Sequence, residues 1–504
     1  MSLVSISFLL FFLCLLVVYY IVPARFQVYV LAISNIVFYC WAGLKNLPFL
    51  IIVCVFSFSM GLLIDWRKRH TSTILSGIED KQLKKSMRKR EEKKLQALTG
   101  LIVAILVAGW CAFKILSSSL PLGLSFYVFI AISYIVDIYR DKYEPSRNIV
   151  KYSAFMCFFP HLTQGPFSRY DVLGTRIFAE HKFNGENIKN GILLIIWGLI
   201  KKTVIATRIS KLTGTIMAND GSSYSGVFFL ILMIWLVIEL YADFSGYMDI
   251  VSGISKMLGI ELQQNFKQPI FAKSIEEIWH RWHITLGEWF KDYVFYPISI
   301  SPVVQNISKW TKTKFSVKVG RAIPIYISLV LVWTSTGLWH GLAFKYLAWG
   351  WLNLIFIAGS ILLSDTYKKI LNALRIKNDN KFFNLFRMIR TFLIFGLMEM
   401  VSSAPSLRTA LRWATSIITG NGHINAEYAI SWFPGLDWFD VAIVAIGVVA
   451  ILIADIIHEK GISFIGVINK WNIVPRYIFY CFCVFIVIVL GDIGGEVSFM
   501  YAQF

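Results

Sequence analysis

Apolar runs recur along the whole chain, and most of them are long enough to cross a lipid bilayer. A hydrocarbon core of about 30 Å is spanned by about 20 residues of helix, and lipid offers the backbone no other hydrogen-bond partners. These runs predict an all-α, polytopic integral membrane protein, in which the first run is a retained helix and not a signal peptide. They cover residues 3–22, 26–44, 47–64, 97–113, 115–136, 191–200, 225–242, 322–344, 346–363, 391–400, 439–457 and 475–491.

The composition excludes a typical soluble enzyme and a disordered chain. Apolar residues make up 57% of the sequence and charged residues 16%, whereas an ordinary soluble domain has about 25% charged residues. The 49 Lys and Arg exceed the 30 Asp and Glu by 19. In a membrane protein such an excess first indicates basic cytoplasmic loops, so no nucleic-acid partner is expected.

The most polar stretch, residues 67–94 within a basic segment of about 65–96, carries eleven Lys or Arg and four Asp or Glu. We expect it to be cytoplasmic and partly helical, because basic loops stay on that side of a membrane. Three runs precede it, which predicts an N-terminus outside, and two runs follow before the next basic loop at 140–151. The short, charge-flanked run at 191–200 is expected to be re-entrant or tilted. No repeat or linker divides residues 1–504, which predicts one integral domain.

Residues 274–297 hold two His, one Arg, one Lys, four carboxylates and three Trp between apolar runs. Charges at that density need a cavity or an interface, and the mixed run at 284–300 is expected to form re-entrant or tilted helices. On a continuous helix Glu276, His280 and His283 would follow at one-turn spacing and could hold a metal. HxxH spacing alone is common and no fourth ligand is evident, so no metal is expected. An interfacial amphipathic helix with Trp anchors is the alternative.

His340 is the one side chain within the run at 322–344 that titrates near neutral pH. An ionisable residue at that depth is costly unless it is paired or faces a polar cavity, so function is the default hypothesis. Neutral imidazole is a base suited to taking a proton from a hydroxyl that then attacks a thioester. Gly337 and Gly341 leave room beside it for a ligand or for a close helix. A histidine hydrogen-bonded to a neighbouring helix is the alternative.

Three acids close the apolar run that ends near residue 249, and two of them, Glu239 and Asp243, share a helical face. Acids in that context need partners, and Arg281 or Lys291 are the candidates that the sequence offers. Structural ion pairing is favoured over catalysis for these acids.

Several short motifs follow one another along most of the chain. They are residues 120–127 with 133–140, 158–160 with 165–166, 241–249, 265–269, 281–286 with 289 and 292–293, 337–341, and 499–504. In this order they resemble the membrane-bound O-acyltransferase family, in particular its bacterial branch with the alginate and peptidoglycan O-acetyltransferases and the teichoic-acid D-alanyl transfer protein.

The resemblance implies a helical bundle around a channel, with short re-entrant helices, a thioester entering from the cytoplasm and an acceptor hydroxyl from outside. His340 matches the signature histidine of the family, implied to be the base. His283 matches its second histidine, which would line the channel and orient the thioester or the acceptor. No role is carried onto His280. The other residues expected to line the channel or contact substrate are Trp282, Trp339, Asp292, Asp243 and Arg281.

The implied function is transfer of an acetyl group across the bacterial cytoplasmic membrane, from acetyl-CoA to an extracytoplasmic acceptor in cell-wall or exopolysaccharide O-acetylation. Acetyl-CoA is then a substrate, and no bound cofactor is expected. An extracytoplasmic partner of the SGNH-hydrolase type is expected to esterify the glycan. Residues 398–404 depart from the aromatic stretch of alginate-type proteins, which weakens alginate as the particular acceptor.

Two other functions stay open. A carrier protein, not CoA, would deliver an acyl or D-alanyl group to a teichoic-acid-type acceptor. A transporter would use His283, His340 and the acids as a proton path and predicts paired half-repeats; no repeat is visible, which favours the enzyme. No G-x-S-x-G elbow, Walker sequence or dinucleotide fingerprint stands out, so neither serine-hydrolase nor nucleotide-driven chemistry is indicated.

Overall fold

A computed structural model describes residues 3–44, 47–116, 121–162, 164–222, 224–377, 380–420 and 432–492. Two parts of the motifs, residue 120 and residues 499–504, lie outside these ranges. Residue contacts divide the chain into unit 1, Met1–Ile192 with Val251–Gln263, and unit 2, Leu193–Ile250 with Gln264–Phe504. The prediction of one integral domain over the whole chain is not tested by this division and stays a prediction.

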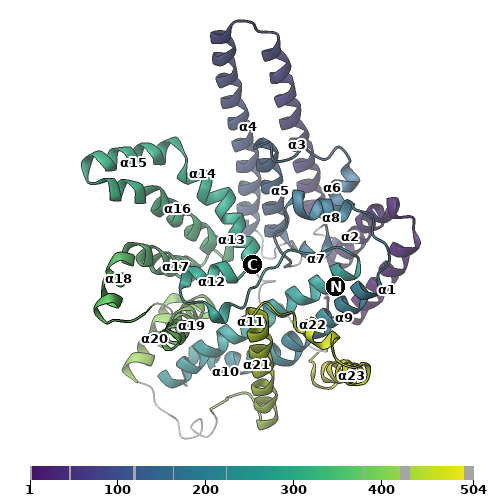
Figure 1. Ribbon diagram of the computed structural model, residues 1–504, viewed down its shortest axis with the longest axis vertical. Coiled ribbons are helices and arrows are strands. Elements are labelled where there is room, and N and C mark those ends of the chain that lie inside the picture. Colours follow the sequence, from purple (N-terminus) through teal and green to yellow (C-terminus); the bar gives the residue numbers. More distant parts are fainter. Residues whose placement is uncertain are drawn as a thin grey trace. The chain divides into compact units, whose positions relative to one another are not determined.

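Unit 1 is built around a long antiparallel hairpin of α3 (Leu47–Ser76) and α4 (Lys81–Leu116), which Figure 1 shows in purple and blue. The basic stretch expected to be partly helical is helical except for residues 77–80. α5 (Leu124–Tyr139) packs against both helices of the hairpin. The other helices of this unit are α1 (Ile6–Ile21), α2 (Gln27–Gly43), α6 (Ile149–Met156), α7 (Phe159–Leu162) and α8 (Thr175–Phe178).

The two basic loops of unit 1 lie at the same end of its helices. Lys68 Nζ of α3 lies 2.6 Å from Asp141 Oδ1, just beyond α5. Arg147 Nη2 lies 3.0 Å from Asp65 Oδ2 of α3. Loops on one side of a membrane must share an end of the bundle, so this geometry agrees with the topology deduced from charge. The assignment of that end to the cytoplasm rests on the positive-inside rule.

Seven helices of the described residues are long and apolar enough to cross a membrane. On α23, Ile478 and Ile488 are 64% and 70% exposed, an apolar surface that suits lipid and not water. The chain is therefore an all-α, multi-pass membrane protein, as the sequence predicted. The seven helices are α3, α4, α11 (Gly226–Met257), α16 (Val317–His340), α17 (Phe344–Leu362), α21 (Trp438–Glu459) and α23 (Ile473–Leu490).

One apolar run folds differently from the sequence prediction. The run at 115–136 is divided, because α4 ends at Leu116 and α5 begins only after Gly123, whose φ of 72° suits glycine. A side chain at Gly123 would also meet the Leu162 carbonyl oxygen at 2.4 Å. The run at 191–200 belongs to α9 (Gly185–Leu199), which continues through π-helical turns at Ile200–Ala206 into α10 (Thr207–Met217). That this run is re-entrant or tilted stays a prediction.

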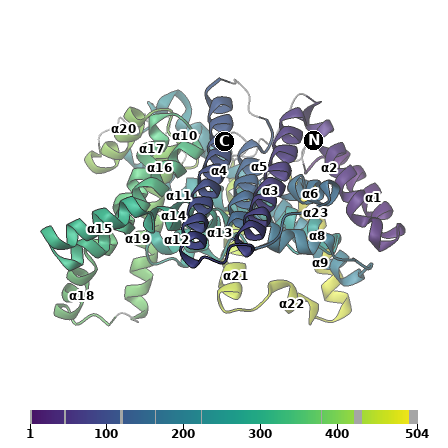
Figure 2. The same cartoon turned by 90° about the horizontal axis from the view of Figure 1, so that it is seen from above.

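Two spanning helices of unit 2, α16 and α17, form a hairpin and lie side by side in Figures 1 and 2. Glycines let the two backbones meet: a Cβ at Gly350 would lie 2.4 Å from the Trp333 carbonyl oxygen, and one at Gly337 would lie 2.7 Å from that of Tyr346. The space beside Gly337 is thus filled by a close helix. The hairpin contacts α15 (Pro302–Lys314), α18 (Ser364–Ala373), α19 (Lys381–Ser403) and α20 (Leu407–Thr419), whereas α22 (Phe464–Asn469) packs against α21.

We predict that Gly350→Ala destabilises the protein, because the added methyl group meets a backbone carbonyl that cannot rotate away. Overpacking of this kind costs about 1–3 kcal/mol, which thermal unfolding in detergent would register as a lower Tm. Gly359→Ala on the same helix is the matched control, because nothing lies within 4 Å of its Cβ. Equal Tm values for the two variants would contradict the close packing at Gly350.

Candidate functional site

His283 lies on a sharp turn between two short helices of unit 2, α12 (Ile275–Arg281) and α13 (Ile284–Phe290). Its backbone is left-handed, with φ 47° and ψ 49°, a conformation that is rare for a non-glycine residue and typical of functional sites. Two hydrogen bonds hold the turn: Lys267 N–H donates to the Arg281 carbonyl at 2.8 Å, and Ile284 N–H to that of Asn265 at 3.0 Å.

Residues 276–283 do not form the continuous helix on which Glu276, His280 and His283 would share one face. The chain leaves the helix at Trp282, which pairs with Phe266 in an antiparallel bridge. As a result His283 is 3% exposed, whereas Glu276 and His280 are exposed. Within the part of the chain that the structure describes, no three His, Cys, Asp or Glu side chains group as a metal site.

Asn265 sets the orientation and the tautomer of the His283 ring. Its Oδ1 accepts from Thr285 N–H at 3.1 Å and from the Thr285 hydroxyl at 2.9 Å, and the backbone donor fixes which way the amide faces. The same oxygen lies 3.3 Å from His283 Nδ1. Because an amide oxygen only accepts, Nδ1 carries the hydrogen, and Nε2 of the neutral ring keeps its lone pair. Phe244 of α11 holds the ring edge-to-face at 4.8 Å between centroids.

His283 is neutral over the ordinary pH range. It lies outside the seven helices that could cross a membrane, and burial lowers its pKa to about 3, with a further lowering by positive charge on His340. Water no longer stabilises the imidazolium at this position. The ring can therefore accept a proton or a hydrogen bond through Nε2 without first losing one.

Trp339 joins the two histidines that the sequence singled out. Its ring centroid lies 6.2 Å from that of His283 and 4.8 Å from that of His340. His340 is the last residue of α16 and is partly exposed, whereas Trp339 is 2% exposed. Two imidazoles from separate elements thus meet at one buried indole, which is a geometry suited to proton transfer at a shared substrate.

The other side of His340 is held by an aromatic and acidic pair. Trp349 of α17 lies 4.6 Å from His340 between ring centroids. Its indole N–H donates to Glu399 Oε1 at 3.0 Å, and the Ser402 hydroxyl lies 3.3 Å from Oε2. Glu399 belongs to α19 and is 7% exposed. A buried carboxylate therefore fixes the indole against which His340 packs.

The remaining predicted residues lie at different distances from this centre. Trp282 lines an apolar cavity of about 120 Å³ that Phe395 and Tyr241 also border. Arg281 pairs with Glu277 at 3.0 Å and with Glu459 of α21 at 2.7 Å. Arg281 therefore ties α12 to α21.

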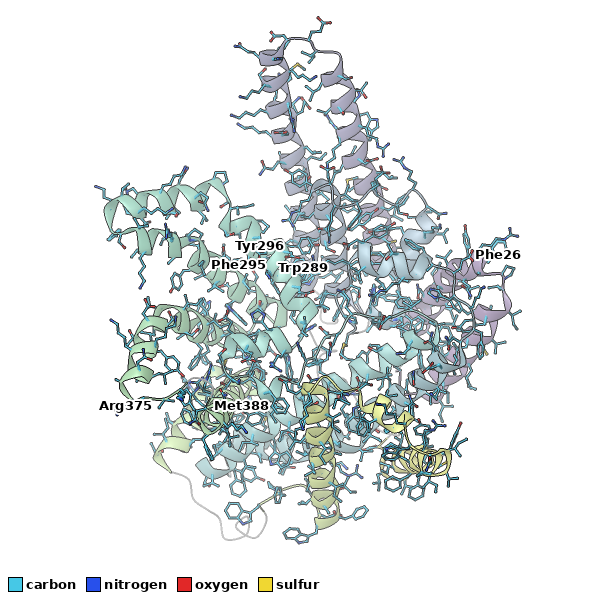
Figure 3. The ribbon with its side chains drawn as sticks, viewed as in Figure 1. Phe26, Trp289, Phe295, Tyr296, Arg375 and Met388 are labelled. Carbon is cyan, nitrogen blue, oxygen red and sulfur yellow. The ribbon has the colours of Figure 1, made fainter. Side chains whose placement is uncertain are left out.

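Asp292 follows α13 in the π-helical turns Lys291–Phe295. The aromatic residues Trp289, Phe295 and Tyr296 that Figure 3 labels come from α13, these turns and α14 (Tyr296–Ser299). Asp292 thus lies in the aromatic-rich segment that follows His283.

Asp243 forms an ion pair, but not with the partners that the sequence suggested. Lys202 Nζ of the π-helical turns bonds its Oδ1, and the Lys202 side chain is fully buried. A second ion pair joins the same two elements, because Lys201 of the π-helical turns lies 2.7 Å from Asp249 of α11. Arg281 and Lys291 were wrong as candidates, because α11 packs its acidic face against residues 200–206. Asp243 precedes Phe244, so this pair anchors the helix that supports His283.

Sequence reasoning missed Asn265, Glu399 and the two lysines as parts of the site. Asn265 stood at the start of a recognised motif, residues 265–269, and membership of that motif was the available signal. Lys201 and Lys202 follow directly on an apolar run, so their charges had to be met by the acids of another helix. Glu399 fell in the stretch that departs from the alginate-type pattern.

Comparisons with known proteins identify the family of this chain. The family model of the membrane-bound O-acyltransferases matches residues 81–403, which include both histidines. The chain belongs to the membrane-bound O-acyltransferase family and is a multi-pass membrane acyltransferase, as its motifs indicated.

Its relatives lie among bacterial envelope acyltransferases. The chain is 29% identical over 402 residues to the probable alginate O-acetylase AlgI of Azotobacter vinelandii, covering 78% of this chain and 73% of that protein. It is 24% identical over 443 residues to the peptidoglycan O-acetyltransferase of Helicobacter pylori, covering 79% and 75%. A teichoic acid D-alanyltransferase of Bacillus subtilis is 28% identical over 233 residues, covering 45% and 56%.

We predict that Lys202→Met and Asp243→Asn each destabilise the protein, because each leaves one buried charge without its counter-ion. Removing one partner of a buried pair costs about 3–5 kcal/mol. The double variant removes both charges and should melt closer to wild type than either single variant. Thermal unfolding of the three purified variants tests this. A double variant that melts below both single variants would show that the residues do not act as a pair.

Proposed function

We propose that the protein is a transmembrane O-acetyltransferase that moves the acetyl group of cytoplasmic acetyl-CoA to a hydroxyl on an extracytoplasmic acceptor of the cell wall or of an exopolysaccharide. The observation that carries this proposal is the meeting of His283 and His340 at Trp339 in a family of acyltransferases. Relatives named for alginate and peptidoglycan O-acetylation support acetyl as the group and a glycan as the acceptor class.

In this mechanism His340 takes the proton of the acceptor hydroxyl as its oxygen attacks the thioester carbon. The carbon–sulfur bond breaks, the acceptor leaves as an acetyl ester, and the proton passes to the CoA thiolate. His283, with Asn265 on its Nδ1, presents Nε2 to orient the acceptor hydroxyl. The indole N–H of Trp339 and backbone groups near Gly337 are the candidate donors for the developing oxyanion.

The direction of transfer rests on charge and length. The basic loops predict a cytoplasmic face for CoA, and an N-terminus outside the bacterial inner membrane. Pantetheine extends about 20 Å, enough to bring a thioester roughly to the middle of a 30 Å core. CoA then needs no carrier across the bilayer. An extracytoplasmic partner of the SGNH-hydrolase type would complete transfer to the glycan.

We predict that His340→Ala abolishes acetyl transfer, because loss of a general base costs about 10²–10⁴-fold in rate. Labelled acetyl-CoA is supplied to membranes that contain the variant and natural envelope acceptors, and base-labile ester is counted. His280→Ala is the matched control, since His280 is exposed and has no part in the site; it should retain wild-type transfer.

The outcomes separate the alternatives. Equal labelling by wild type and His340→Ala would refute the assignment of the base. No labelling by either, with transfer restored by an acylated carrier protein, would favour the D-alanyl type of donor. Solute movement across the membrane without ester formation would favour a transporter.

We predict that Asn265→Asp makes transfer sensitive to acid. The new carboxylate keeps an oxygen for Thr285 but places negative charge beside His283 Nδ1, which raises the pKa of the ring from about 3 by about 1–3 units. A protonated ring has no lone pair, so transfer is lost as pH falls through the raised pKa. The ratio of the rates at pH 5.5 and pH 8 should be lower for the variant than for wild type. An unchanged ratio would show that His283 does not act in its neutral form.

A further inference from the structure

A cavity of about 1370 Å³ opens among α12, α17, α18 and α19 of unit 2, on a flank that neither His283 nor His340 lines. One wall is apolar and comes from the spanning helix α17 and from α19, with Ile355, Phe356 and Ile394. The other wall is basic, and among the described residues that line it Glu276 is the one carboxylate. Its cations are Lys273, Lys368, Arg375, Lys377, Arg387 and Arg390, of which Figure 3 labels Arg375 just beyond α18.

Part of this basic wall is fixed in place and ready to accept a ligand. Arg390 Nη2 donates to the Lys273 carbonyl at 2.8 Å, which anchors the guanidinium. Its Nε is buried without a hydrogen-bond partner among the described residues, and so is the hydroxyl of the neighbouring Thr391, which is 1% exposed. Buried donors of this kind are normally satisfied. Both side chains border the cavity, so a small rotation of either would let an anion there satisfy its donor.

The cavity lies at the basic end of the α16–α17 hairpin. Lys318 near the start of α16 pairs with Asp365 at the start of α18 at 2.7 Å, so these two ends adjoin. The same end carries α15, whose charged residues are Lys309, Lys312 and Lys314. By the positive-inside rule this end faces the cytoplasm, where the leaflet contains anionic lipids.

We propose that this cavity binds an anionic phospholipid. Its phosphate would lie among Lys368, Arg375 and Arg390, and its acyl chains along the apolar wall of α17 and α19. Basic pockets between membrane helices on the cytoplasmic side bind such head groups. A soluble phosphate ester such as CoA would match the cations but not the apolar wall, which is why the lipid is the favoured occupant. The proposal concerns binding alone and does not depend on acyl transfer.

The test uses the full chain, purified in a neutral detergent and stripped of lipid. Native mass spectrometry follows binding of phosphatidylglycerol and of phosphatidylcholine with identical acyl chains. Wild type should bind phosphatidylglycerol at a concentration about tenfold lower, since each nearby Lys or Arg adds about fivefold to the attraction. Lys368→Gln/Arg375→Gln, at two exposed positions, should remove most of this preference.

Lys84→Gln/Lys85→Gln is the matched control, because these lysines line a basic groove between α3 and α4 of unit 1. The control should keep the full preference, and the Tm of each variant reports its folding. If the double variant does not fold, Arg375→Gln alone replaces it. This single variant should lower the preference for phosphatidylglycerol over phosphatidylcholine to about the square root of the wild-type ratio. Equal binding of the two lipids by wild type, or equal loss in the control, would overturn the proposal. Displacement of phosphatidylglycerol by micromolar CoA would overturn it in favour of a donor-phosphate site.

Discussion

The three hydrogen bonds that converge on the Asn265 amide oxygen are the interaction on which the geometry of the site depends. They hold Thr285 and the ring of His283, whose own backbone is left-handed. A non-glycine residue in that conformation costs about 1–2 kcal/mol. Net gains of about 1 kcal/mol per hydrogen bond, together with the bridge between Phe266 and Trp282, offset this cost. The fold thus places a neutral imidazole with a defined tautomer before any substrate arrives.

The second constraint is the close contact of α16 and α17. Because Gly337 and Gly350 let the backbones meet, the first turns of α17 bring Trp349 against His340, and Glu399 of α19 fixes that indole. The position of His340 is therefore fixed by α16, α17 and α19, whereas that of His283 is fixed by the turn between α12 and α13. Two independent supports thus hold the two imidazoles beside Trp339.

The sequence predicted the class of fold and singled out His340 because both signals are local, whereas His283 was singled out by its match to a family motif. Long apolar runs follow from the thickness of a bilayer, and His340 stood out as an ionisable group within such a run. The break at Trp282 could not be predicted, because residues 275–290 have helical spacing throughout. What breaks the helix is pairing with residues 265–267, a contact that tertiary structure alone supplies.

The predicted partners of the acids on α11 were wrong for a related reason. The sequence placed acids on α11 and cations at Arg281 and Lys291, and nearness in the motif order suggested that they meet. The partner of each acid is instead set by which helix packs on α11, and the π-helical turns at 200–206 present Lys201 and Lys202 to it. A buried charge in an apolar environment needs a counter-ion, but the identity of that counter-ion is determined by tertiary packing.

The helices that support the histidine centre also form the basic cavity. α17 carries Trp349 near one end and Ile355 and Phe356 toward the other, and α19 carries Glu399 and Arg390 in the same way. A ligand seated between the basic ends of these helices would make contacts with both and hold them together. The hydrogen bond between Trp349 and Glu399 also depends on how α17 packs against α19. A ligand that changes the packing of these two helices would therefore change the position of the indole beside His340. If the proposed lipid occupies the cavity, it would therefore also stabilise the position of His340 between these helices.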